Sequence, residues 1–157
     1  MYTKILVPND GSEIAAAAIP HARSIALAEG AGIVLIHVVE SPAHLLARTS
    51  GAWLPDGGVA VEATFEAAEA ARAAAERELA TMKQELEAAG VRPVEVYVVE
   101  GSAGSAIVEA ASEHGCDLVV MSTHGRSGFK RAILGSVADH VIRHATVPVL
   151  LCRPREE

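Results

Sequence analysis

Short apolar runs alternate with helical patterns along the chain, and this alternation restricts the possible folds more than any other feature. The run GIVLIHVVE, Gly32–Glu40, is almost continuously apolar, as expected of a strand buried on both faces of a parallel sheet. The other predicted strands are Tyr2–Pro8, Val94–Glu100, Asp117–Met121 and Val147–Arg153. Strands that are separated by helices form parallel sheets with right-handed crossovers. The sequence therefore predicts an α/β fold with five parallel strands.

The sequence signals that start and end the helices between these strands differ in strength. The first has Ser12 as its candidate N-cap and ends at Gly30, and Pro20 within it is expected to kink the helix or reset its first turn. The stretch 41–58, with two prolines and three glycines, is predicted as a long irregular loop, which is usually functional or mobile. The remaining helices are predicted at 61–90, as one helix or two in line, at Ser105–Gly115 and at Ser136–Ala145.

Length, charge and cysteine content exclude several classes of protein. The 157 residues, half of them hydrophobic, predict a single domain over residues 1–157 with an aliphatic core. A net charge of −7 argues against nucleic acid and against anionic membrane surfaces as partners. No run of about 18 apolar residues is present, and the N-terminus lacks the features of a signal peptide. Cys116 and Cys152 form no CxxC pattern, so we expect a reduced, cytoplasmic chain.

The segment MSTHGRSGFKRAILGS, residues 121–136, has the composition of a phosphate-binding loop. It combines glycines, hydroxyls and cations without an acidic residue, although the chain as a whole is acidic. Glycines let the backbone approach a ligand, and successive N–H groups form anion-binding concavities. A helix that begins at Ser136, with Asp139 in a capping pattern, would add the positive end of its dipole. The alternatives are a plain turn and a solvated basic face. The residues concerned are Gly125, Gly128, Gly135, Arg126, Lys130, Arg131, Ser127 and Ser136.

A second polar segment, PNDGS, follows the first predicted strand. In open parallel sheets, ligands bind at the carboxyl ends of the strands where the strand order reverses. If the first and fourth strands are neighbours, both polar segments face one crevice. An acidic side chain such as Asp10 at a strand end suits a ribose hydroxyl, although an aspartate before Gly11 is equally well explained as a turn residue.

The chain resembles a universal stress protein of the UspA type over nearly its whole length. The matching segments are ILVPNDGSE, IHVVE, VVEGSAGSAIVEAA and VVMSTHGRSGFKRAILGSVADHVIRHATVPVLL. The resemblance implies a single Rossmann-like domain, whose five-stranded parallel sheet has the order 3-2-1-4-5 and helices on both faces. It also implies a homodimer joined through the last strand, Val147–Arg153. In one branch of the family it implies ATP binding, with Mg²⁺ or Mn²⁺.

The ATP-binding branch carries the motif G-x-x-G-x9-G-[S/T], and the chain matches it with one departure. Gly125, Gly135 and Ser136 fit, whereas Ser122 stands where a glycine is usual. The serine could crowd the phosphates or donate a hydrogen bond to them. By the resemblance, Asp10 contacts ribose or adenine, Val38 and Met121 line the adenine slot, and the glycine loop surrounds the phosphates. The implied site residues are Pro8, Asn9, Asp10, Val38, Met121, Ser122, Gly125, Arg126, Gly128, Gly135, Ser136 and Val137.

Other chemistry-bearing residues are explained better as structural. His140 and His144 lie four residues apart on one helical face, but the glutamate of a zincin motif is missing, so surface histidines are favoured over a metal site. Cys116 has no flanking base or cation and is interpreted as structural. In the stretch 41–60, apolar side chains could cover the nucleotide or a partner, or pack on the long helix. These side chains are Leu45, Leu46, Trp53 and Leu54.

Together these patterns predict an ATP-binding, homodimeric stress-response protein whose nucleotide state regulates its partners. A dedicated enzyme is disfavoured, because no general base is evident beside the phosphate loop. Two alternatives stay open. One is a dimeric interaction module that binds no nucleotide, which Ser122 favours, and the other is a slow ATPase or phosphotransfer switch.

Overall fold

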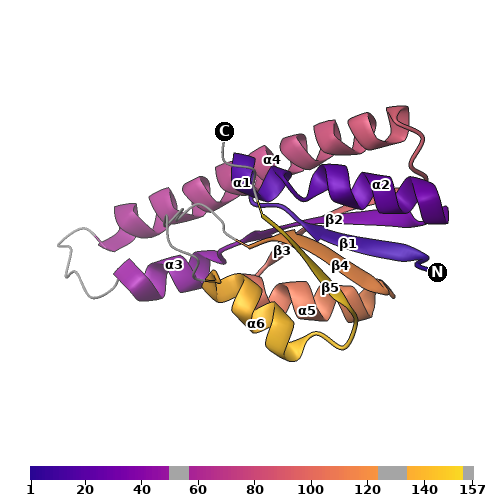
Figure 1. The fold of residues 1–157 in the computed structure, drawn as a ribbon. Coiled ribbons are helices and arrows are strands. Elements are labelled where there is room, and N and C mark those ends of the chain that lie inside the picture. Colours follow the sequence, from indigo (N-terminus) through magenta and orange to yellow (C-terminus); the bar gives the residue numbers. More distant parts are fainter. Residues whose placement is uncertain (50–56, 124–133, 154–157) are drawn as a thin grey trace.

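A five-stranded parallel sheet forms the centre of the molecule, in the order β3-β2-β1-β4-β5 (Figure 1). The computed structural model describes residues 1–49, 57–123 and 134–153. Both the α/β class and the strand order that the family resemblance implied are confirmed. The strands are β1 (Lys4–Pro8), β2 (Gly32–Val39), β3 (Val94–Glu100), β4 (Leu118–Ser122) and β5 (Val149–Cys152).

Helices cover both faces of the sheet (Figure 1). One face carries α1 (Glu13–Ala16), α2 (Ile19–Glu29) and α4 (Gly57–Ala88), and the other carries α5 (Ala103–Glu113) and α6 (Ser136–His144). Successive side chains of a strand point to opposite faces, so the core has two layers. Ile5 and Val7 of β1 belong to the layer that includes Leu79 of α4. Leu6 belongs to the opposite layer, together with Ile107 of α5.

The first predicted helix is divided in two, as Pro20 indicates. Pro20 lies in the first turn of α2, where its missing N–H costs no helical hydrogen bond. Ser12 is the N-cap of α1, as predicted, and its Oγ accepts a hydrogen bond from the Ala15 N–H at 3.1 Å. Gly30 ends α2 with φ of 70°, a conformation that glycine adopts without steric cost. The prediction that Pro20 resets the helix is therefore confirmed.

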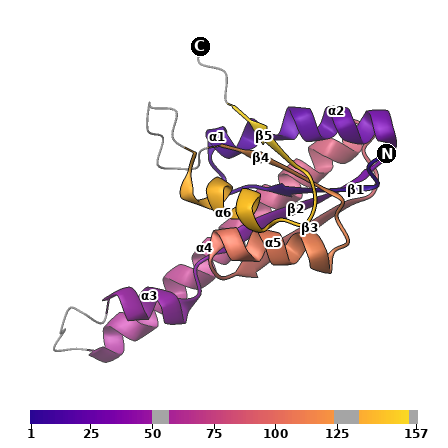
Figure 2. The ribbon, with the colours of Figure 1, turned by 60° about the horizontal axis from the view of Figure 1, so that its bottom comes forward.

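Residues 42–49 and 57–58 of the predicted irregular loop 41–58 are helical, so the prediction is wrong there, and residues 50–56 lie outside the described residues. Helix α3 spans Pro42–Thr49, and α4 begins at Gly57 and continues as one helix to Ala88. Ser41 initiates α3, because its Oγ accepts a hydrogen bond from the His44 N–H at 3.2 Å and a proline follows it. The neighbouring prolines and glycines conceal this start signal in the sequence. Helix α3 and the N-terminal part of α4 project together beyond the sheet (Figure 2).

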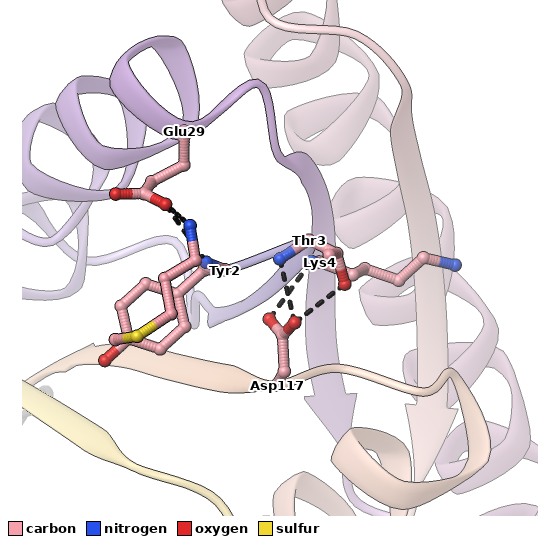
Figure 3. A network of polar contacts seen from close by, with 6 residues as sticks. Tyr2, Thr3, Lys4, Glu29 and Asp117 are labelled. Carbon is pink, nitrogen blue, oxygen red and sulfur yellow. Dashed lines mark hydrogen bonds and ion pairs between the residues drawn. The ribbon is translucent and has the colours of Figure 1, made fainter.

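The amino end of the sheet is fastened by Asp117, at the start of β4 (Figure 3). Its carboxylate accepts hydrogen bonds from the Thr3 N–H at 2.8 Å, the Thr3 hydroxyl at 2.7 Å and the Lys4 N–H at 3.1 Å. Partial burial acts to raise the pKa of Asp117, but these hydrogen bonds outweigh it, and the pKa lies below its usual value. Asp117 thereby aligns β1 with β4, the two strands whose opposite ends carry the polar segments.

Several predicted boundaries move by one to three residues. β1 begins at Lys4, β5 is confined to Val149–Cys152, and α5 begins at Ala103, two residues before the predicted Ser105. β3 and β5 are the edge strands. Within the described ranges, none of the helices combines the length and apolar character that crossing a bilayer requires.

Candidate functional site

A cavity of about 290 Å³ lies at the carboxyl ends of β1 and β4. These strands are neighbours in the sheet although more than a hundred residues separate them in the sequence, and the strand order reverses between them. The segment PNDGS and the described ends of the segment 121–136 therefore line one crevice, as predicted. The volume is at the lower end of the range for small-molecule sites, roughly 300–1,000 Å³.

Nine of the twelve predicted site residues line this cavity. They are Pro8, Asn9, Asp10, Val38, Met121, Ser122, Gly135, Ser136 and Val137. Gly125, Arg126 and Gly128 lie outside the described residues, so their contacts with a ligand stay a prediction. The cavity also has lining residues that the sequence did not point to: Ala15, Ile36, Ala103, Ile107, Thr123 and Ala138.

Three of the unforeseen residues are alanines near the starts of three different helices. Ala15 belongs to α1, Ala103 is the first residue of α5, and Ala138 lies in the first turn of α6. Small side chains at these points leave space where the helix ends converge on the strand ends. No signal in the sequence separates them from the many other alanines, because their shared property is a position in space.

The wall of the cavity on the α5 and α6 side is apolar. Ile36 and Ile107 are buried there, with Met121 beside them and the partly buried Val38 at the end of β2. All four belong to the core layer between the sheet and these helices. An apolar wall with few polar groups is typical of a site for a flat heterocycle.

The opposite side is shaped by the turn between β1 and α1. Asn9 Oδ1 accepts a hydrogen bond from the Gly11 N–H at 2.7 Å. Asp10 Oδ1 accepts two hydrogen bonds from Ser12, from its N–H at 3.0 Å and its hydroxyl at 2.6 Å. Asp10 therefore has the turn role that the sequence left open, and it also lines the cavity. The two interpretations of Asp10 do not exclude each other.

The N-terminus of α6 forms another part of the wall. Gly135 is the N-cap, and glycine has no side chain that could accept a hydrogen bond from the first N–H groups of the helix. The predicted pairing of Ser136 with Asp139 as a capping motif is wrong. Ser136 is already helical, and the Asp139 carboxylate instead accepts a hydrogen bond from Arg143 Nε at 2.9 Å. A helix N-terminus that begins with a glycine N-cap at a cavity is suited to an anion.

Comparison with known proteins places this architecture in a family. The family model of the universal stress protein family matches residues 1–153. The chain belongs to the universal stress protein family. Universal stress protein MJ0531 of Methanocaldococcus jannaschii is 34% identical over 158 residues, an alignment that covers 100% of this chain and 86% of that protein.

Solved universal stress proteins and their relatives share the fold. The structure of MJ0577, a universal stress protein of the same archaeon, superimposes with a TM-score of 0.81 at 28% identity and covers 100% of this chain and 99% of its own. A universal stress protein solved in complex with cAMP has a TM-score of 0.63 at 24% identity and covers 98% of each chain. Because the identity to the cAMP-bound protein is only 24%, this similarity shows a shared fold and nothing more.

Within this universal stress protein, Ser122 is the departure from the ATP-binding motif. It ends β4, two residues after Val120, whose side chain belongs to the layer facing α4. Because side chains alternate along a strand, the Ser122 hydroxymethyl group is directed to that same face, opposite to Met121. The side chain of Ser122 therefore does not fill the apolar part of the cavity. Ser122 Oγ is buried and has no hydrogen-bond partner among the described residues.

The residues interpreted as structural have structural surroundings. The rings of His140 and His144 stack with centroids 4.2 Å apart, and His144 Nδ1 lies 2.8 Å from the His140 carbonyl oxygen. In the described ranges, no group of three or more acidic, histidine or cysteine side chains could hold a metal ion. Burial raises the pKa of Cys116 to about 11, which keeps its thiol protonated and unreactive. Leu45 and Leu46 are partly buried in α3.

Proposed function

We propose that the chain binds ATP in the cavity at the carboxyl ends of β1 and β4. The observation that carries the proposal is the combination, in one cavity, of an apolar wall, a carboxylate at a strand end and a helix N-terminus whose N-cap is a glycine. These three features suit an aromatic base, a ribose hydroxyl and a phosphate chain, respectively. A protein of the same fold was solved in complex with cAMP, so the fold accommodates an adenine nucleotide.

Each part of the nucleotide has candidate contacts in this arrangement. Val38 and Met121 would hold the adenine, and Asp10 would accept a hydrogen bond from the ribose. The first N–H groups of α6, with the Ser136 hydroxyl and the glycines and cations of 124–133, would bind the phosphates. Mg²⁺ usually keeps several waters and is held largely by phosphate oxygens, so a divalent cation needs no protein cage here.

We propose that the nucleotide is a regulatory ligand, with hydrolysis slow at most. Among the described residues that line the cavity, Asp10 is the only titratable side chain, and its Oδ1 is engaged with Ser12. A general base needs hydrogen-bond reach to the attacking water and a pKa near the working pH. Measured phosphate release separates a binder from the slow ATPase or phosphotransfer alternative.

The proposed functional unit is a cytoplasmic homodimer joined through β5. Edge strand β5 exposes Leu150, and its neighbours Val149 and Leu151 are only partly buried. An apolar edge strand needs to be covered, and a second copy across a two-fold axis covers it with the same strand. The nucleotide state of the dimer would then set its stress-response partners.

A paired substitution on the strand ends tests nucleotide binding. Val38 and Val99 are register partners on β2 and β3, but only Val38 lines the cavity. Val38→Trp should fill the base site and abolish binding of ATP in calorimetry, whereas Val99→Trp should leave it intact. Identification of the nucleotide that copurifies with the wild type completes the test. If the wild type binds no ATP at millimolar concentration, the alternative of a nucleotide-free interaction module replaces the proposal.

A further inference from the structure

The projecting helices form a surface that the nucleotide site does not explain. We call α3 together with residues 57–69 of α4 the arm. The arm begins after the carboxyl end of β2 and extends beyond the sheet (Figure 2). It therefore does not pack on either face of the sheet. In the body, by contrast, α4 buries Ala75, Leu79 and Leu86 against the sheet.

An apolar strip lies along the α4 side of the arm. Val61 and Phe65 are four residues apart, so their side chains are neighbours on one helical face. Their exposed fractions are 42% and 52%. Phe65 is one of only two phenylalanines in the chain, and it lies outside the described core, whose buried side chains are mainly aliphatic. Aromatic side chains are enriched at the cores of protein interfaces, so an exposed phenylalanine beside a second apolar side chain is suited to anchoring a partner.

The charge beside this strip is acidic. Glu62, Glu66 and Glu69 are exposed along the adjacent helical face. Arg72, the next cation along the helix, already pairs with Glu76 at 3.3 Å and with Glu100 at 3.6 Å. A second copy of the chain, with its net charge of −7, would add repulsion at such a surface. Charge complementarity therefore calls for a basic partner.

We infer that the arm docks a cationic amphipathic helix of a partner protein, with Val61 and Phe65 contacting its apolar face and Glu62, Glu66 and Glu69 pairing with its lysines or arginines. Peptide helices of this kind bind by laying their apolar face on an apolar surface. Acidic residues along the rim favour basic partners and raise the association rate. The inference is independent of the nucleotide, because all of its residues lie outside the cavity.

A labelled synthetic peptide tests the inference on the full chain. The probe is an 18-residue leucine and lysine peptide with helical amphipathic order, and its control has the same composition in an order that lacks an apolar face. In fluorescence anisotropy, the wild type should bind the ordered peptide at least about ten-fold more tightly than the control peptide. Equal affinity for the two peptides would reveal mere charge attraction and would overturn the inference, as would no binding.

Matched variants locate the contact. Phe65→Ser should weaken binding about ten-fold or more, whereas Leu27→Ser, which alters an equally exposed residue on α2 (49%), should not. Glu66→Gln should weaken binding at low salt more than Glu113→Gln, an exposed glutamate on α5. Because all four side chains are exposed, each variant should fold, which circular dichroism checks. If Phe65→Ser leaves the affinity unchanged, or lowers the oligomeric state in sedimentation, the arm does not dock this partner.

Discussion

Replacing Asp117 by asparagine tests how the end of the sheet opposite the cavity is held together. The carboxylate accepts three hydrogen bonds, two at Oδ2 from Thr3 and one at Oδ1 from Lys4. Asparagine preserves one acceptor oxygen and replaces the other by an N–H₂ group, which cannot accept a hydrogen bond from a backbone N–H. A hydrogen bond to a charged group contributes about 1.5–3 kcal/mol. Thr3 is exposed and water can replace part of the loss, so Asp117→Asn should lower the free energy of unfolding by about 1–2 kcal/mol at pH 7.

The stability difference between wild type and Asp117→Asn should depend on pH. The pKa of Asp117 is lower in the folded protein than its usual value of about 3.9, so the contribution of the carboxylate is complete above about pH 5. It is lost as the pH falls through the folded pKa. The difference between wild type and Asp117→Asn should therefore be constant from about pH 5 to 8 and shrink below about pH 4.

Guanidinium unfolding of the wild type and Asp117→Asn at pH 7 and pH 3, at one protein concentration, measures the difference in the free energy of unfolding at each pH. The matched control is Asp139→Asn, which removes an exposed pair with Arg143 and should leave the free energy of unfolding almost unchanged. Equal stability of wild type and Asp117→Asn at pH 7 would refute the reasoning. An undiminished difference at pH 3 would show that charge does not contribute.

Three further substitutions address ligand binding and assembly. Asp10→Ala should weaken ATP binding roughly ten-fold in calorimetry, because it removes a charge-assisted hydrogen bond. ATP at about a hundred times its dissociation constant should raise the melting temperature of the wild type by about 5–10 °C. Gly125→Val should abolish this rise. It should leave the dimer intact, because β5 is a separate strand. Val149→Pro removes a backbone donor from β5 and should yield a monomer in light scattering, whereas a persistent dimer would place the interface elsewhere.

The sequence by itself determined the fold class and most elements of the sheet. Continuous apolar runs and helical periodicity are local signals, so the five strands and the reset of α2 at Pro20 could be predicted to within a few residues. The two polar segments at strand ends were visible for the same reason. Nine residues predicted from those segments and from the family resemblance line the observed cavity.

Short-range signals failed where competing local contacts decided the outcome. Ser41 and a following proline start α3 inside a stretch whose prolines and glycines indicated a loop. The carboxylate of Asp139 pairs with Arg143, one turn further along α6, and so does not cap the helix. In both cases the sequence allowed two local arrangements, and propensity alone does not rank them.

The tertiary structure decided which distant residues meet. The pairing of β1 with β4 creates the crevice, and helix starts from three parts of the chain bring Ala15, Ala103 and Ala138 to its wall. The direction of the Ser122 side chain depends on the alternation of β4 against the helices on each face. None of these relations is encoded in a short window, because each arises from long-range packing of the two core layers on the sheet.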